Sequence, residues 1–292
     1  MTKPMPALFP VFSLLLAASL WGVIWYPLRL LEAAGLSGLW TTLASYGAAL
    51  LLGLLPSVPR LGELRRQPLW LLVLALSAGW CNVAFILAVL EGTVVRVLLL
   101  FYLSPIWAVL LAWLLLGERL SAQARGVFAL AVVGALIMLW DPVIGLPWPR
   151  GPGDWLAVSS GLTFALSNVM IRRMQQVSVP IKTMSSWAGV LLITGSMLMF
   201  KGTMQLPDVS ASVWLSAAAL GWFGIVIMTL AVQYGVTHMP VHRSAVILLF
   251  ELIAGAVSAG LLTEEVVRPL EWFGGLLIIV AAYWAARLQT HE

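Results

Sequence analysis

Long apolar stretches separated by short polar segments dominate this chain. A helix that crosses a bilayer needs about 20 predominantly apolar residues, and ten stretches come close to that length or exceed it. They lie at 9–30, 38–56, 68–90, 95–117, 122–140, 153–174, 182–200, 212–235, 242–262 and 270–287. The stretches are rich in Leu and Ala and lack the alternation typical of a membrane β-strand. The pattern therefore predicts an all-α integral membrane protein with ten transmembrane helices.

Composition and charge support this prediction and suggest an orientation. Of 292 residues, 61% are hydrophobic and 10% are charged, whereas soluble domains carry about 25% charged residues. In a membrane protein, the placement of the positive residues matters more than the net charge of +4, so we expect a lipid bilayer rather than nucleic acid as the partner. With the N-terminus inside, eleven basic residues fall on the cytoplasmic side: Lys3, Arg60, Arg65, Arg66, Arg119, Arg125, Arg172, Arg173, Lys182, Arg243 and Arg287. Five fall outside: Arg29, Arg96, Arg150, Lys201 and Arg268. Both termini are therefore predicted to be cytoplasmic.

The two halves of the chain resemble each other. Trp21-Gly22 followed by Arg29 matches Phe164-Ala165 followed by Arg172, at an offset of 143. The run 96–100 leading to Ser104-Pro105 matches the run 243–247 leading to Glu251-Leu252, at an offset of 147. The pattern indicates a first five-helix repeat at 1–146 and a second at 147–292. Because five is odd, the second copy must enter the membrane from the opposite side.

Inverted repeats of this kind are typical of carriers. Two halves related by a twofold axis in the membrane plane can exchange conformations and open a central site alternately to each side. Duplication kept only for helix packing is the alternative. The repeat favours transport.

Two runs of residues are similar to a known transporter group. Gly153-Asp154-Trp155-Leu156 leads through Phe164-Ala165 to Arg172-Arg173, and Ser104-Pro105 leads to the run 113–118, which ends in Gly117-Glu118. With the ten spans and the repeat, these runs resemble the drug/metabolite transporter superfamily, EamA type, over nearly the whole chain. Within it, the Trp-rich sequence is most similar to bacterial aromatic amino-acid exporters.

The resemblance implies a basket-shaped bundle in the bacterial inner membrane. Its first, third, fourth, sixth, eighth and ninth helices would surround a central cavity, and the fifth and tenth would lie at the periphery. The chain departs from the family's usual Glu-Pro pair in the fourth helix of each half. The first copy has Ser104-Pro105 and the second has Glu251-Leu252.

Glu251 is the main candidate for function. It stands about nine residues into its predicted helix, which places it near the middle of the bilayer. Acidic groups there are rare and usually face a cavity or a partner. As a carboxylate it could hold a substrate ammonium, or it could bind and release a proton. The alternative is a protonated Glu bonded to a neighbouring helix.

Polar and aromatic residues near the same depth form two weaker candidate groups. Ser160, Thr163 and Ser167 share one face of the sixth helix, with Asn168 adjacent. They could line a cavity, although small hydroxyl residues also mediate helix packing in membranes. Aromatic walls suit an aromatic or cationic guest, although packing explains any single Trp equally well. The aromatic candidates are Trp21, Trp25, Trp80, Tyr102, Trp107 and Trp187. Ser104 is a further polar candidate.

Other chemistries leave no pattern in the sequence. There is no Gly-rich phosphate loop, no motif of a catalytic nucleophile with a base, and no third ligand beside His238 and His242 for a metal ion. Arg96 and Arg243 occupy equivalent positions at helix starts, where they could attract a carboxylate or extend to the membrane interface. We expect no catalytic residue, cofactor or metal.

The prediction is a secondary transporter that exports amino acids, aromatic and other neutral ones first, by alternating access. A carrier of another class, such as hydrophobic cations, is an open alternative. A non-transporting membrane scaffold is another. The oligomeric state, a monomer included, and the coupling ion are left open by the sequence.

Overall fold

The computed structural model describes residues 8–91, 94–140, 148–264 and 267–287, and its secondary structure there is entirely helical. The predicted boundary between residues 146 and 147 and the predicted cytoplasmic Lys3 lie outside these residues. The segments of the first half are α1 (Phe9–Val23), α2 (Trp25–Ala33), α3 (Gly38–Ser57), η1 (Val58–Arg65), α4 (Pro68–Glu91), α5 (Val94–Phe101), α6 (Ser104–Leu116) and α7 (Ala122–Met138). Those of the second are α8 (Pro152–Arg173), α9 (Val179–Phe200), α10 (Ala211–Ala219), η2 (Leu220–Ile225), α11 (Val226–His238), α12 (Val241–Leu248), α13 (Phe250–Leu262) and α14 (Pro269–Arg287).

Each of the ten predicted spans is helical, but not all meet the requirements for a membrane span. By length and composition, eight helical stretches of the described chain are long and apolar enough to cross a bilayer. Helix α7 has 17 residues and is shorter, and α8 carries Ser, Thr and Asn side chains together with Asp154. That α7 and α8 also cross the membrane, which would give a total of ten spans, therefore stays a prediction.

Three of the predicted spans are interrupted rather than continuous. Two breaks have a proline cause: Pro27 would clash with the carbonyl of Val23, where α1 ends, and Pro105 with that of Phe101, where α5 ends. The third break, at Leu249 between α12 and α13, has Leu252 where the first half has Pro105. The two fourth-helix breaks thus fall at equivalent positions of the repeat, although only one of them contains a proline.

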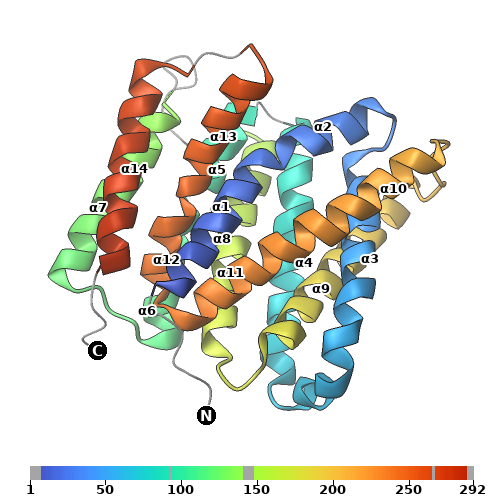
Figure 1. Cartoon of the computed structure of the whole chain (residues 1–292), viewed down its shortest axis with the longest axis horizontal. Coiled ribbons are helices and arrows are strands. Elements are labelled where there is room, and N and C mark those ends of the chain that lie inside the picture. Colours follow the sequence, from blue (N-terminus) through green and yellow to red (C-terminus); the bar gives the residue numbers. More distant parts are fainter. Residues whose placement is uncertain (1–7, 92–93, 141–147, 265–266, 288–292) are drawn as a thin grey trace.

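Contacts between the two halves follow the order that a twofold relation requires. Helix α4 packs on α8, and the equivalent α11 packs on α1. Helices α5 and α6 pack on α8 as α12 and α13 pack on α1. Helix α3 packs on α9, and α7 packs on α14, so equivalent helices also meet each other. Helices α7 and α14 stand together at one side of the bundle, as the family resemblance implied (Figure 1).

The first helices of the two halves run in opposite directions. The ring of Phe9, at the start of α1, lies 5.1 Å from that of Tyr234 near the end of α11. Arg172, at the end of α8, donates a hydrogen bond to the carbonyl of Thr237 at that same end of α11. The start of α1 and the end of α8 therefore lie at one end of the bundle, as expected for an inverted repeat.

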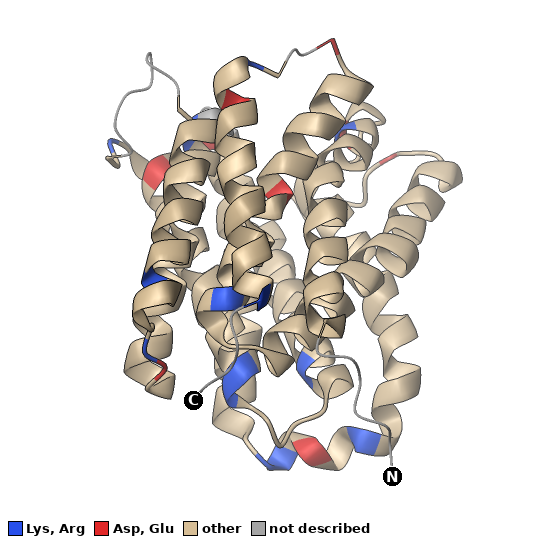
Figure 2. Ribbon diagram, turned by 60° about the vertical axis from the view of Figure 1, so that its left-hand side comes forward, with Lys and Arg blue, Asp and Glu red and all other residues tan. Residues whose placement is uncertain are grey.

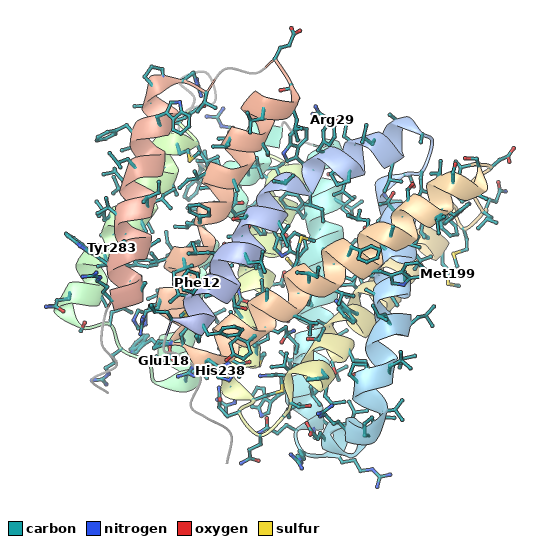
Figure 3. All side chains as sticks on the ribbon, viewed as in Figure 1. Phe12, Arg29, Glu118, Met199, His238 and Tyr283 are labelled. Atoms are coloured by element: carbon teal, nitrogen blue, oxygen red, sulfur yellow. The ribbon has the colours of Figure 1, made fainter. Side chains whose placement is uncertain are left out.

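We call this end, where α1 begins and α14 ends, the terminal end, and the opposite one the distal end (Figure 1). More of the Lys and Arg segments lie in the half of the bundle nearest the termini (Figure 2). Large apolar side chains such as Phe12, Met199 and Tyr283 are exposed and project from the sides (Figure 3). Such an apolar periphery suits contact with lipid.

Close helix crossings depend on glycines at a few points. A Cβ at Gly189 of α9 would overlap the carbonyl oxygen of Ala75 in α4 and lie 2.7 Å from the Cα of Ala75. A Cβ at Gly274 of α14 would lie 2.6 Å from the carbonyl oxygen of Gly134 in α7. Small residues let helix backbones approach closely in membranes, where dispersion contacts drive association.

Candidate functional site

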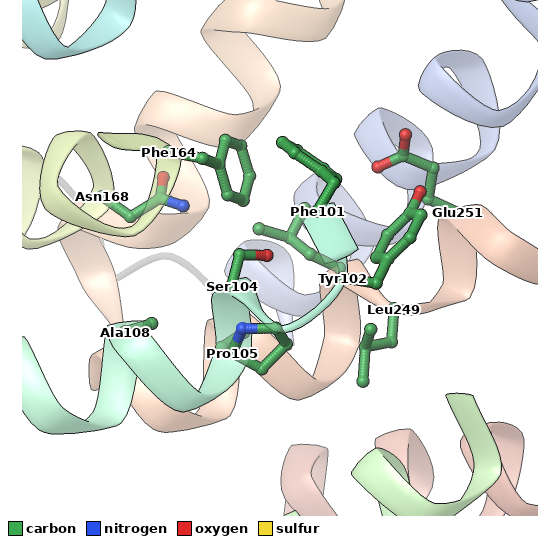
Figure 4. Close-up of a pocket in the computed structure, with 11 residues that line it drawn as sticks. Phe101, Tyr102, Ser104, Pro105, Ala108, Phe164, Asn168, Leu249 and Glu251 are labelled. Atoms are coloured by element: carbon green, nitrogen blue, oxygen red, sulfur yellow. The ribbon is translucent and has the colours of Figure 1, made fainter. Parts of the chain in front are cut away.

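A small pocket lies where the two broken fourth helices meet α8 (Figure 4). Its volume is about 20 Å³, room for roughly one water molecule. It is lined by Phe101, Tyr102, Ser104, Pro105, Ala108, Phe164, Asn168, Ala245, Leu248, Leu249 and Glu251. Both helix breaks contribute to this lining, so the irregular backbone lies inside the protein, where membrane proteins tolerate it.

Glu251 brings the only charged group among these lining residues. It stands in the first turn of α13, where the positive end of the helix dipole favours a carboxylate. The hydroxyl of Tyr102 points toward its carboxylate, and the two side chains interact (Figure 4). Glu251 thus borders the pocket and contacts Tyr102 at the other break, and its role in substrate binding or proton transfer stays a prediction.

Asn168 supplies a polar group on the other side of the pocket. Its residue is 5% exposed, and its amide is drawn toward Ser104 and Phe164 (Figure 4). No hydrogen bond joins this amide to another side chain of the described residues. Because the amide faces the pocket, it has capacity to bind a guest.

Three aromatic rings form the apolar wall of the pocket. The ring centroid of Phe101 lies 5.3 Å from that of Tyr102 and 5.6 Å from that of Phe164. Tyr102 was predicted from the sequence as a site residue, whereas Phe101 and Phe164 were not. Phe164 stands four residues before Asn168, which places both on one face of α8. That spacing could have identified it.

The other residues of the α8 stripe lie outside this lining, and two of them bond to a neighbouring helix. The Ser160 hydroxyl donates to the carbonyl of Cys81 at 2.7 Å, and the hydroxyls of Ser167 and Ser77 lie 2.9 Å apart. Thr163 bonds to the carbonyl of Ser159 within its own helix at 2.9 Å. Of the polar stripe, only Asn168 borders the pocket; Ser160 and Ser167 join α8 to α4.

The predicted tryptophans also lie outside the pocket lining. The indole N–H groups of Trp25, Trp80 and Trp187 donate to hydroxyls, at 2.9 Å to Ser258, 3.2 Å to Ser159 and 3.2 Å to Thr229. Trp21 packs against the buried cluster around Tyr46, and Trp107 packs against the largest buried cluster. In this conformation these residues connect helices rather than form the pocket wall.

The two equivalent arginines have partners inside the protein. The Nε of Arg96 lies 2.8 Å from Asp154 of α8. Arg243 donates to the carbonyls of Ala285 and Ala286 at 2.7 and 3.0 Å, which satisfies free carbonyls at the end of α14. Neither borders the pocket. Within the described residues, no group of three His, Cys, Asp or Glu could hold a metal ion.

A bundle of long apolar helices, with a pocket between two inverted halves, defines a multi-pass membrane protein. The chain belongs to the EamA-like transporter family, whose pattern matches residues 8–140 and, a second time, 151–287. Its members are transporters rather than enzymes, and the protein is a membrane transporter. No curated protein sequence matches it. A solved crystal structure is similar over 97% of this chain and 99% of its own, with a TM-score of 0.74 and 17% identity, which shows the fold alone.

Proposed function

We propose that this protein is a secondary transporter that exports amino acids, aromatic and other neutral ones first, across the bacterial inner membrane by alternating access. The observation that carries the proposal is Glu251, an acidic group at the break of one fourth helix, facing the break of the other across an aromatic pocket. The ten spans and the cytoplasmic termini belong to this proposal.

The lining offers a partner for each part of an amino acid. The Glu251 carboxylate would hold the ammonium group, because opposite charges attract strongly where water is scarce. The Asn168 amide and the Ser104 hydroxyl would donate to the carboxylate, and Phe101, Tyr102 and Phe164 would contact the side chain by offset or edge contacts. The pocket holds about one water molecule, so binding requires the halves to separate.

The test is flux through purified protein in liposomes loaded with a panel of amino acids. We expect flux of Trp, Phe, Thr or Met. Absence of flux for all four, together with clear flux of a compound from another class, would reject the proposed substrates. Empty liposomes and the Glu251→Gln variant provide the background.

Hydrophobic cations are a second candidate class, and one observation favours them. The pocket lining contains a carboxylate and three aromatic rings but neither Lys nor Arg, which suits a cation without a carboxylate. Adding such a cation to the panel separates the two classes. Flux of the cation without any amino-acid flux would favour this second class.

Replacing Asn168 with Ala tests the polar half of the pocket. If its amide binds the substrate carboxylate, the KM for flux should rise about threefold to tenfold, the effect of one lost hydrogen bond. Asn82→Ala provides a matched control. Asn82 donates to the Tyr46 hydroxyl at 3.3 Å and lies outside the pocket lining. An unchanged KM in the Asn168 variant would remove this residue from the site.

A further inference from the structure

Glu118 and Arg172 form an ion pair at the terminal end of the bundle. The Arg172 Nε lies 3.1 Å from the Glu118 carboxylate, and their side chains are 28% and 19% exposed. Glu118 follows α6 in the first half, and Arg172 lies in the last turn of α8 in the second. The pair therefore joins the two halves, and its partial burial protects it from full screening by solvent.

The same two side chains hold both helix ends at the turn between α11 and α12. Arg172 donates to the carbonyl of Thr237 in the last turn of α11 at 3.0 Å. Glu118 accepts from the backbone N–H of Val241, the first residue of α12, at 2.9 Å. A cation at a helix C-terminus and an anion at an N-terminus both satisfy free backbone groups and oppose the local dipole.

Further donors strengthen this attachment from α9 and from the end of α8. The Lys182 ammonium, which is fully buried, donates to the Thr237 hydroxyl at 2.6 Å and to the carbonyl of Ile171 at 3.0 Å. Gln175 donates to the carbonyl of Thr237 at 3.0 Å. Thr237 is therefore held from three side chains, and the end of α11 is fixed against α8 and α9.

Among the described residues, the distal end does not repeat these contacts. Helices α11 and α12 pack on α8, but across the described residues α4 and α5 make no extensive contact with α1 or α2, the equivalent pairs. Arg29 is the equivalent of Arg172 in the first repeat. It forms no ion pair with any described residue and lies over the Trp25 ring, 5.2 Å from its centroid. Figure 3 shows Arg29 and Glu118 at opposite ends of the molecule.

We infer that the Glu118–Arg172 pair is a gate: it closes the terminal side of the central pocket by fixing the α11–α12 turn, and it must break before that side opens. Along the chain, Ala112 lies between the pocket-lining Ala108 and Glu118, and Ile171 lies between the pocket-lining Asn168 and Arg172. Both residues belong to one buried apolar cluster. The inference rests on alternating access in the proposed function, but it does not depend on which substrate is carried.

Cysteine labelling tests the gate. In a Cys81→Ser background, Ala245→Cys places a single thiol in the pocket wall on α12. A maleimide that cannot cross membranes is applied from the terminal side. Glu118→Gln and Arg172→Gln should each raise the labelling rate about fivefold, and the double variant should be little faster than either, because both remove the same ion pair.

Asp154→Asn is the matched control, since it breaks the Arg96–Asp154 ion pair between α5 and α8 at the distal end. It should leave labelling from the terminal side unchanged. Wild-type rates in both gate variants, or an equal rise in Asp154→Asn, would overturn the inference. Faster labelling of the gate variants without amino-acid flux would retain the gate and reject the substrate class. Amino-acid flux with unchanged labelling would retain the substrate class and reject the gate.

Discussion

Glu251→Gln is expected to reduce amino-acid flux about 10- to 100-fold. The amide keeps the shape of the side chain but removes the charge that would hold the substrate ammonium, and a hydrogen bond to a charged group contributes about 1.5–3 kcal/mol. The effect should appear mainly in KM and in substrate binding. It is measured as initial flux from liposomes over a range of substrate concentrations.

A second readout separates ammonium binding from proton coupling. Flux is compared with and without a pH gradient in wild type and in Glu251→Gln. Unchanged affinity with loss of the pH-gradient dependence would assign Glu251 to proton exchange instead of substrate binding. Glu32→Gln, an exposed acidic residue of α2, is the control and should match wild type in both measurements. Wild-type behaviour of Glu251→Gln would exclude both roles.

Gly189→Val is expected to damage the fold rather than the site. The new side chain would meet the backbone of Ala75 in α4, which cannot move aside as a flexible side chain can. Overpacking a core usually costs about 1–3 kcal/mol, and we expect at least the upper value here. For a chain of 292 residues, this corresponds to a fall in apparent Tm of about 5 °C, measured as loss of the monodisperse peak on heating in detergent.

Gly195→Val is the matched control on the same helix. No heavy atom outside its own helix backbone and immediate neighbours lies within 4 Å of a Cβ at this position. The two variants share the same change in helix propensity, so the difference between them reports the α4–α9 crossing. Equal Tm values for both variants would show that the two helices do not depend on this close approach.

The helical segments were predictable because their signal is local. A run of about 20 apolar residues must hide its backbone polar groups within itself, and a helix does this without a partner. Two of the three helix breaks also have a local cause, since Pro27 and Pro105 stand four residues after the ends of α1 and α5. The break at Leu249 has no such signal and is visible only in the structure.

The candidate site was predictable only in part. Of the predicted residues, Tyr102, Ser104, Asn168 and Glu251 line the pocket, and Tyr102, Ser104 and Glu251 lie beside the helix breaks. The polar stripe of α8 was a more ambiguous signal. Helical spacing shows that Ser160 and Ser167 share a face, but it cannot show that this face meets α4.

The family, the helical class and the duplicated halves follow from the sequence itself, because apolar length and repeated order persist whatever the helices contact. Which helix faces meet is a different kind of information, set by the packing of residues far apart in the chain. The tertiary structure alone places Phe101 and Phe164 in one pocket with Glu251, and joins both Glu118 and Arg172 to the α11–α12 turn. These contacts depend on how the two inverted halves fit together, which no local pattern records.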